Sequence, residues 1–308
     1  MAAKYFTLTE NFIDNWRNAT PPWGFGALSY VVYKRTSSRL LPSGGTEEWW
    51  QTCRRVVEGC YNAQIAHCER NHLPFNMNKA QRSAQRMYEL MFTMKWLPPG
   101  RGIEHMGAES VNAKGGAVLI NCSLVSTQDI DKDFSRPFTY MMDFSSLGVG
   151  VAFDTRGAGK VRINGFNHDK VNHFTIPDSR EGWVESLRIL LEAGANGGAR
   201  PVFDYSLIRP YGSPLKTLGG TASGPVPLAE MHFAIYSILE AARGQLISST
   251  MIVDIFNWIG RCIVAGGTRR SAQLALGASD DAEFFTLKDP DLYQDELFSH
   301  RWASNNSC

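Results

Sequence analysis

The spacing of hydrophobic and polar positions changes near residue 98, and this change divides the sequence into two regions. Before it, apolar residues recur mainly at helical spacing. After it, short apolar runs alternate with glycine-rich loops and amphipathic helices. Alternation of strands and helices predicts an α/β architecture with parallel strands. We therefore expect a mostly helical region at 1–97 and an α/β region at 98–308.

Two amphipathic helices dominate the first region. One begins at residues 46–48 and places Cys53 and Cys60 on its apolar stripe, and the second covers 79–96 with methionines turned inward. The run at 29–33 is β-branched and aromatic, which predicts a strand. The Pro-Pro-Gly sequence at 98–100 ends the second helix, because proline removes backbone donors and glycine frees φ.

The central stretch of the second region is an apolar run at 119–125 that is interrupted by Cys122. Turn residues on both sides predict a buried strand within 117–125. Its expected partner is 147–153, where Gly148 and Gly150 occupy alternate positions. Glycine weakens a strand, so this pattern indicates that a ligand or another backbone approaches one face closely. The two strands together predict a narrow apolar floor that carries one thiol.

Two glycine-rich loops follow a helix that begins at 178–181 with a capping-box pattern. The first loop, 209–225, combines small hydroxyl residues with Arg209 and Lys216. Backbone amides in such turns form concave anion sites, which two cations would complete for a phosphate. The second loop, 265–271, ends another helix. Composition alone supports a second interpretation equally well, in which each loop is a helix cap or turn whose arginines are solvated.

Composition narrows the class of protein without fixing its function. The chain has 308 residues, 44% of them hydrophobic and 20% charged, with a formal net charge of +1. This balance gives no electrostatic reason to expect a nucleic-acid or membrane partner. The sequence has no run long enough to span a membrane and no apolar signal core at its start, so we expect a cytoplasmic protein. The six cysteines form no CxxC motif and are expected to be reduced thiols at rest.

Common catalytic motifs are absent from the sequence. It contains no P-loop, no GxGxxG followed by an acidic residue, no HExxH and no GxSxG. The seven histidines are scattered, and none is assigned a catalytic role. Cys122 has no neighbouring base in the sequence, which leaves chemistry of the Cys–His type unsupported.

Seven collinear motifs together resemble the adenosylcobalamin-dependent ribonucleoside-triphosphate reductases over essentially the whole chain. They are NC at 121–122, GVG at 148–150, PDSREGW at 177–183, IRPYG at 208–212, GGTASGP at 219–225, GGTRRSA at 266–272 and HRWASNNS at 300–307. Two earlier motifs, YKRT at 33–36 and RRVVEG at 54–59, fit the same family. The order of these motifs makes the resemblance far more specific than any one glycine loop.

The resemblance implies the first part of a ten-stranded α/β barrel, preceded by a mostly helical N-terminal region. It implies reduction of ribonucleotides to deoxyribonucleotides for DNA synthesis by thiyl-radical chemistry. Cys122 matches the strand cysteine of the pair that reduces the substrate and becomes a disulfide. Side chains alternate along a strand, so Asn121 and Ser123 should point away from the reacting face.

The resemblance also implies ligand-binding residues. For the substrate these are Asn121, Gly148, Gly150, Ser223 and Gly224. For an allosteric deoxynucleotide effector they are Asp129, Arg209, Lys216, Arg269 and Arg270. Adenosylcobalamin would start the radical chemistry and would be bound mainly by a part of the enzyme that lies beyond this chain. A thioredoxin-like protein is the expected reductant.

In this family the radical cysteine, the second reducing cysteine and a C-terminal cysteine pair all follow the position of Ser307. We therefore expect this chain alone to be unable to turn over. Its end at Cys308 fits either an intein junction or a truncated reading frame. Two other functions remain open from the sequence: a reductase with a different radical source, and a fragment that binds nucleotides without catalysis.

Overall fold

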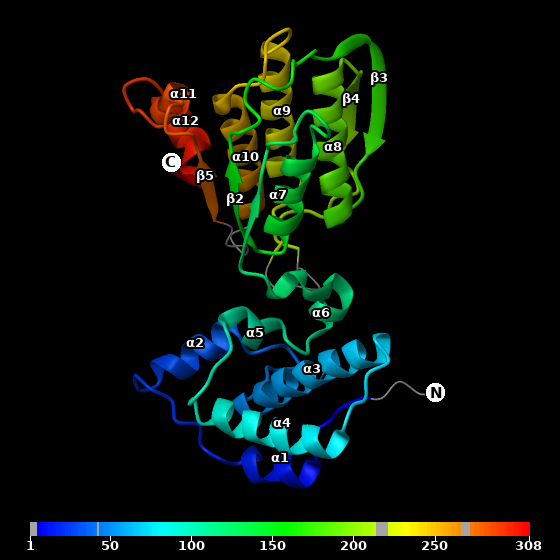
Figure 1. Ribbon diagram of the computed structural model, residues 1–308, viewed down its shortest axis with the longest axis vertical. Helices are drawn as coiled ribbons and strands as arrows, with labels where there is room; N and C mark the ends of the chain where they lie inside the picture. The colour runs from blue at the N-terminus through cyan, green and yellow to red at the C-terminus, as the bar shows by residue number, and fades with distance from the viewer. Residues whose placement is uncertain (1–4, 42, 214–220, 266–271) are drawn as a thin grey trace. The chain divides into compact units, whose positions relative to one another are not determined.

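The computed structural model describes residues 5–41, 43–213, 221–265 and 272–308 (Figure 1). Its contacts divide the chain into two compact units, residues 1–120 and 121–308. The change in hydrophobic spacing near residue 98 lies within the first unit. Three short elements follow it there. They are α5 (Gly100–His105), α6 (Glu109–Lys114) and the 3-10 helix η1 (Gly115–Leu119).

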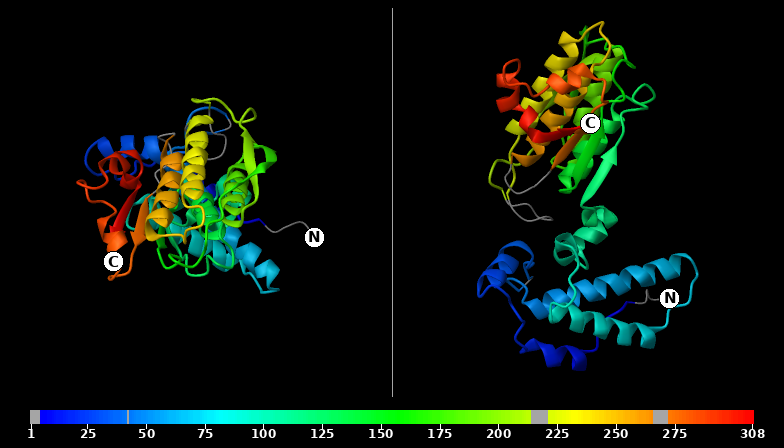
Figure 2. Two further views of the ribbon diagram at one scale, coloured as in Figure 1. Left: turned by 90° about the horizontal axis from the view of Figure 1, so that it is seen from above. Right: turned by 60° about the vertical axis from the view of Figure 1, so that its left-hand side comes forward.

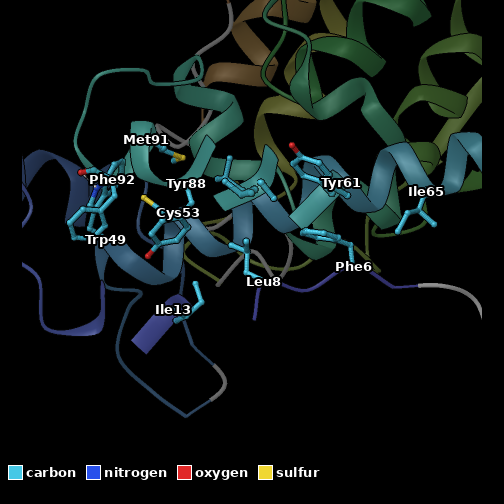
Figure 3. Close-up of a cluster of buried hydrophobic side chains, with 14 of the residues drawn as sticks. Phe6, Leu8, Ile13, Trp49, Cys53, Tyr61, Ile65, Tyr88, Met91 and Phe92 are labelled. Carbon is cyan, nitrogen blue, oxygen red and sulfur yellow. Dashed lines mark hydrogen bonds between the residues drawn. The ribbon is translucent and has the colours of Figure 1, made fainter. Parts of the chain in front are cut away.

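The first unit is helical and is built on α3 (Trp49–Arg70) and α4 (Met77–Phe92), with α1 (Glu10–Arg17) packed on α3. Its core joins Cys53 of α3 to Tyr88 and Phe92 of α4 (Figure 3). Burial raises the pKa of the Cys53 thiol well above its usual range. Cys53 therefore lies in the hydrophobic core, where its side chain contributes to packing.

The strand predicted at 29–33 is wrong, because these residues lie in helix α2 (Leu28–Thr36). Only Tyr33 of this helix is buried: its ring packs on Trp23 and Trp49, and its hydroxyl lies 2.7 Å from the Thr52 hydroxyl. Val31 and Val32 remain exposed. Tertiary anchoring of one aromatic residue therefore overrides the β propensity of the valines.

The second unit contains a four-stranded parallel sheet in the order β1-β2-β5-β6. The strands are β1 (Cys122–Val125), β2 (Gly150–Asp154), β5 (Gln273–Leu276) and β6 (Ser304–Ser307). The predicted pairing of the cysteine strand with the glycine strand is confirmed, with Cys122 opposite Gly150. Both strands are shorter than expected. Residues 115–119 form the 3-10 helix η1, and Gly148 lies in the turn before β2.

Helices α7 (Arg136–Ser146), α8 (Arg180–Asn196), α9 (Val226–Ala241) and α10 (Ser249–Val264) pack together as one cluster (Figures 1 and 2). Helices α7 and α10 cover the sheet, where Phe153 of β2 stacks on Phe256 at 3.9 Å between ring centroids. The predicted helix start at 178–181 is confirmed, since the Ser179 side chain accepts a hydrogen bond from the Gly182 amide. A helical first region followed by an α/β region with parallel strands is therefore confirmed.

The second unit also contains a smaller sheet and three short helices. A second parallel sheet, β3 (Asn167–Thr175) with β4 (Ala199–Asp204), packs on α8 through β4. Helices α11 (Ala282–Thr286) and α12 (Gln294–Ser299) and the 3-10 helix η2 (Arg301–Ala303) precede β6. None of the described helices has the length and the apolar run needed to cross a bilayer.

A buried histidine ties α9 to α8 and to the segment after β4. The Nε2 atom of His232 lies 3.0 Å from the Ser186 hydroxyl, and its Nδ1 atom lies 2.8 Å from the Tyr205 hydroxyl. Burial lowers the pKa of His232 to about 3, and burial raises the pKa of Tyr205 to about 12. His232 is therefore a neutral structural group in the folded protein at neutral pH.

This histidine should make the protein less stable in acid. Unfolded His232 binds a proton near pH 6.5, whereas the folded side chain does so only near pH 3. The contribution of neutral His232 to the free energy of unfolding is fully present above about pH 6.5. Below that pH the free energy of unfolding should fall by up to about 1.4 kcal/mol for each pH unit. Urea unfolding of His232→Gln should show a weaker dependence on pH between about pH 7 and pH 5 than the parent protein. The exposed His173→Gln variant is the control, and equal slopes for all three proteins would contradict the assignment.

Candidate functional site

The four-stranded sheet has one face covered by helices and one face open among the described residues. Along β2, Val151 and Phe153 are buried under the helices, and the alternate positions Gly150 and Ala152 are only half-buried. The register extends this alternation across all four strands. The open face carries Cys122, Leu124, Gly150, Ala152, Asp154, Leu274, Leu276, Asn305 and Ser307. We call this surface the open face.

Cys122 begins β1 at the edge of the sheet, and its side chain is exposed on the open face. The prediction of a buried strand at this position is therefore wrong for the described chain. The reason is structural: β1 is an edge strand, and α7 covers only one of its faces. The next residue, Ser123, lies on the helix-facing side, where its hydroxyl oxygen is buried without a hydrogen-bond partner. Cys122 is thus a thiol that a ligand on the open face can reach.

The glycines predicted to bind substrate have different structural surroundings. Gly150 lies directly opposite Cys122, and its amide donates to the Asn121 carbonyl at 2.8 Å. A Cβ atom at Gly150 would meet its nearest neighbours at ordinary distances, so the backbone itself does not demand glycine there. Gly148 has a φ of 81°, and its amide donates to the Ser145 carbonyl. The turn therefore explains Gly148 through its positive φ, whereas Gly150 is the position opposite the thiol that carries no side chain.

At the carboxyl ends of the strands, Asp154 of β2 holds the segment that follows β1. Its carboxylate accepts hydrogen bonds from the Ser126 hydroxyl at 2.6 Å and from the Thr127 amide at 2.8 Å. The predicted effector residue Asp129 follows on the surface and pairs with Lys132 at 2.8 Å. The hydrogen bond from Lys132 lowers the pKa of Asp129. The structure thus fixes the backbone before Asp129 and leaves its carboxylate at the surface.

The predicted loop after Arg209 is closed at its base. The Gly212 amide donates to the Ala222 carbonyl at 3.0 Å, and the Ala222 amide donates to the Ser213 carbonyl at 2.8 Å. Gly224 is buried with a φ of 71°, and a Cβ atom there would approach the Tyr211 amide nitrogen to 3.0 Å. The neighbouring Ser223 is half-buried. The predicted substrate turn therefore packs against the first half of its own loop.

The cations predicted to bind the effector are only partly described. Arg209 forms a hydrogen-bonded ion pair with Asp178 at 2.7 Å, just before α8. Asp178 lies just before the first turn of α8. The unpaired backbone amides of such a turn also favour a bound phosphate. Lys216, Arg269 and Arg270 lie outside the described residues.

Side chains that could hold a metal ion are not clustered among the described residues. Within the described parts of the chain, no group of three histidine, cysteine, aspartate or glutamate side chains is arranged to hold a metal. The buried histidines are engaged elsewhere: His105 lies 3.1 Å from the Ser110 hydroxyl, and His300 lies 2.9 Å from Asp254. No histidine is among the described residues of the open face.

Sequence reasoning identified only part of the open face. It predicted the strands that carry Cys122, Leu124, Gly150 and Ala152, but not β5 with Leu274 or the place of Asn305 beside it. Short strands such as QLAL and SNNS carry a weak period-2 signal, and their pairing joins segments that are far apart in sequence. The signals in the sequence for β6 were the motif at 300–307 and its polar, strand-like pattern.

Two family models match the sequence. The ribonucleotide reductase alpha domain matches residues 8–108, and the insertion domain of B12-dependent ribonucleotide reductase matches residues 151–239. A probable adenosylcobalamin-dependent ribonucleoside-triphosphate reductase of Dictyostelium discoideum is 43% identical and aligns with 99% of this chain and 42% of its own length. The Euglena gracilis adenosylcobalamin-dependent ribonucleoside-triphosphate reductase is 44% identical with the same coverage. A Lactobacillus helveticus enzyme of the same name is 32% identical, over 100% of this chain and 48% of its own length.

The fold matches a solved structure over the same extent. A crystal structure of a B12-dependent (class II) ribonucleotide reductase superposes with a TM-score of 0.82 and 29% identity, covering 98% of this chain and 48% of that one. The chain therefore spans less than half the length of each of these relatives. The sequence motifs, the two family models and the shared fold agree with one another. Over nearly its whole length the chain is similar to adenosylcobalamin-dependent (class II) ribonucleotide reductases, of which it spans less than half.

Proposed function

We propose that this chain forms one wall of the active site in a reductase that converts ribonucleoside triphosphates to 2′-deoxyribonucleotides for DNA synthesis. The observation that carries the proposal is the exposed Cys122 thiol on the open face, directly opposite Gly150. A substrate can lie flat against this part of the sheet, because no side chain of Gly150 occupies the space beside the sulfur. We infer that the sheet is the first part of the predicted ten-stranded barrel and that further strands enclose the open face.

In this proposal Cys122 supplies one of the two reducing thiols. A thiyl radical on a cysteine outside this chain removes the 3′ hydrogen of the ribose and later returns it. The 2′-hydroxyl leaves as water, while Cys122 and a second cysteine outside this chain give up two electrons and two protons and form a disulfide. A dithiol protein of the thioredoxin type then reduces the disulfide. Adenosylcobalamin, when bound, supplies the initiation of the radical.

The rest of the chain would position the nucleotides. Asn121, Gly148 and the turn at Ser223 and Gly224 are proposed to border the nucleoside. Asp129, Arg209, Lys216, Arg269 and Arg270 are proposed to bind a deoxynucleotide effector that selects the base to be reduced. If the effector changes the affinity for the substrate, the substrate must change the affinity for the effector by the same factor.

The function is tested with the completed reductase, meaning this chain joined to the part of a class II reductase that it does not span. Supplied with a ribonucleoside triphosphate, adenosylcobalamin and a dithiol, it should form the deoxynucleotide, and omitting adenosylcobalamin should stop the reaction. Reduction that persists without the cofactor would indicate another radical source. Deoxynucleotide binding without any reduction would indicate a nucleotide-binding fragment instead.

A further inference from the structure

Asn305 of β6 is the polar amide on the open face that has no role in the function proposed above. Its side chain is exposed and makes no hydrogen bond with any described residue. The next residue, Asn306, faces the other way: it is half-buried, and its side-chain oxygen accepts a hydrogen bond from the Ser304 hydroxyl at 3.1 Å. Two identical side chains in one short strand therefore have opposite surroundings, and the Asn306 side chain is the one held by a hydrogen bond within the described residues.

The register fixes where Asn305 lies relative to the thiol. Asn305 is opposite Leu274, which is in line with Ala152 and Leu124 across the sheet. Cys122 begins the neighbouring row, two residues earlier along β1. Adjacent strands lie about 4.8 Å apart, so three spacings place β6 roughly 14 Å from β1. An extended nucleotide can bridge such a span.

The surface between the two residues is low and apolar. Gly150 and Ala152 of β2 contribute at most a methyl group, and Leu124 and Leu274 stand on either side of them. An apolar floor with a few polar groups at its edge is the usual lining of a small-molecule site. A primary amide offers two donors and one acceptor, which suits the edge of a base or the hydroxyls of a ribose.

We infer that Asn305 binds the nucleoside part of the substrate through its side-chain amide, on the same open face as Cys122. This inference rests on the proposed function and adds a positioning residue to it. Binding across the sheet would fix the ribose over Gly150 and keep its reacting side against the sulfur. Misplacing a reacting group by even about 1 Å slows a reaction strongly, so an anchor that holds the ribose in place would increase the rate of reduction.

The test compares Asn305→Ala with Asn306→Ala in the completed reductase. Equilibrium binding of a ribonucleoside triphosphate is measured without adenosylcobalamin, and kcat and KM are measured with it. Asn305→Ala should raise Kd and KM roughly tenfold, because one anchoring hydrogen-bond group is lost. Asn306→Ala should leave the Kd unchanged, since its side chain lies on the helix-facing side of the sheet.

A second variant separates binding from folding. Asn305→Asp has nearly the same shape but lacks the two donors, so it should also weaken nucleotide binding while keeping the urea midpoint of the parent. Unchanged nucleotide binding in both Asn305 variants, or equal losses in the Asn305 and Asn306 variants, would overturn the inference. These outcomes leave the parent enzyme reducing its substrate, whereas failure of the proposed function would appear as no reduction by the parent itself.

Discussion

Replacing Cys122 with serine should abolish repeated turnover of the completed reductase while ribonucleotide binding stays within about twofold of the parent. Serine keeps the size of the side chain but cannot form a disulfide, so the substrate would lose one of its two reducing thiols. We expect the steady-state rate with a dithiol to fall by about a thousandfold or more, as it does when an essential catalytic group is removed. The measurement is deoxynucleotide formed per enzyme over many turnovers.

The matched control is Cys68→Ser, which changes a half-buried thiol on α3 in the first unit. This variant should turn over like the parent, because Cys68 has no role in the proposed reduction. Continued multiple turnover by Cys122→Ser would remove Cys122 from the chemistry. Parallel loss in both variants would point to a general effect of removing thiols.

The second large effect is expected on stability, at a buried ion pair that positions the last strand. Arg301 of η2 donates to both carboxylate oxygens of Asp254 on α10, at 2.7 and 2.9 Å, and only 2% of Arg301 is exposed. Burial alone would raise the pKa of Asp254, but hydrogen bonds from Arg301 and His300 outweigh it and lower this pKa. The pair links α10 to the turn that leads into β6, and therefore to Asn305.

Arg301→Met should lower the free energy of unfolding by roughly 3–5 kcal/mol, because it leaves the Asp254 charge buried without its main partner. Urea unfolding measures the loss. Adding Asp254→Leu to the same protein should restore much of the stability, since no uncompensated charge then remains. Arg188→Met, which breaks an exposed pair with Glu185, should cost less than about 1 kcal/mol. A similar cost for Arg301→Met and Arg188→Met would contradict this account of the buried pair.

Helices and the thiol strand were predictable from the sequence because their signals are local. The helix-spaced apolar residues of α3 and α4 and the serine cap of α8 are each contained within one segment. The pairing of β1 with β2 was also predictable, because the cysteine and the two glycines stand out within short apolar runs. Such features need no knowledge of distant contacts.

The errors came from contacts between distant segments. The valines at 31–32 favour a strand locally, but packing of Tyr33 on Trp23 and Trp49 favours a helix. Burial of Cys122 was inferred from its apolar neighbours, although exposure depends on which strand forms the edge of the sheet. Asn305 faces the open side only because β6 pairs in one register with β5. A shift by one residue would have presented Asn306 instead.

The central claim is that the Cys122 sulfur lies against the ribose and gives up its electrons to it. The most direct measurement is peptide mapping by mass spectrometry after one turnover of the completed reductase without external reductant. The account predicts one deoxynucleotide per active site and Cys122 recovered in a disulfide with a cysteine of the added part. Product formed in the same amount with Cys122 still a free thiol would contradict it.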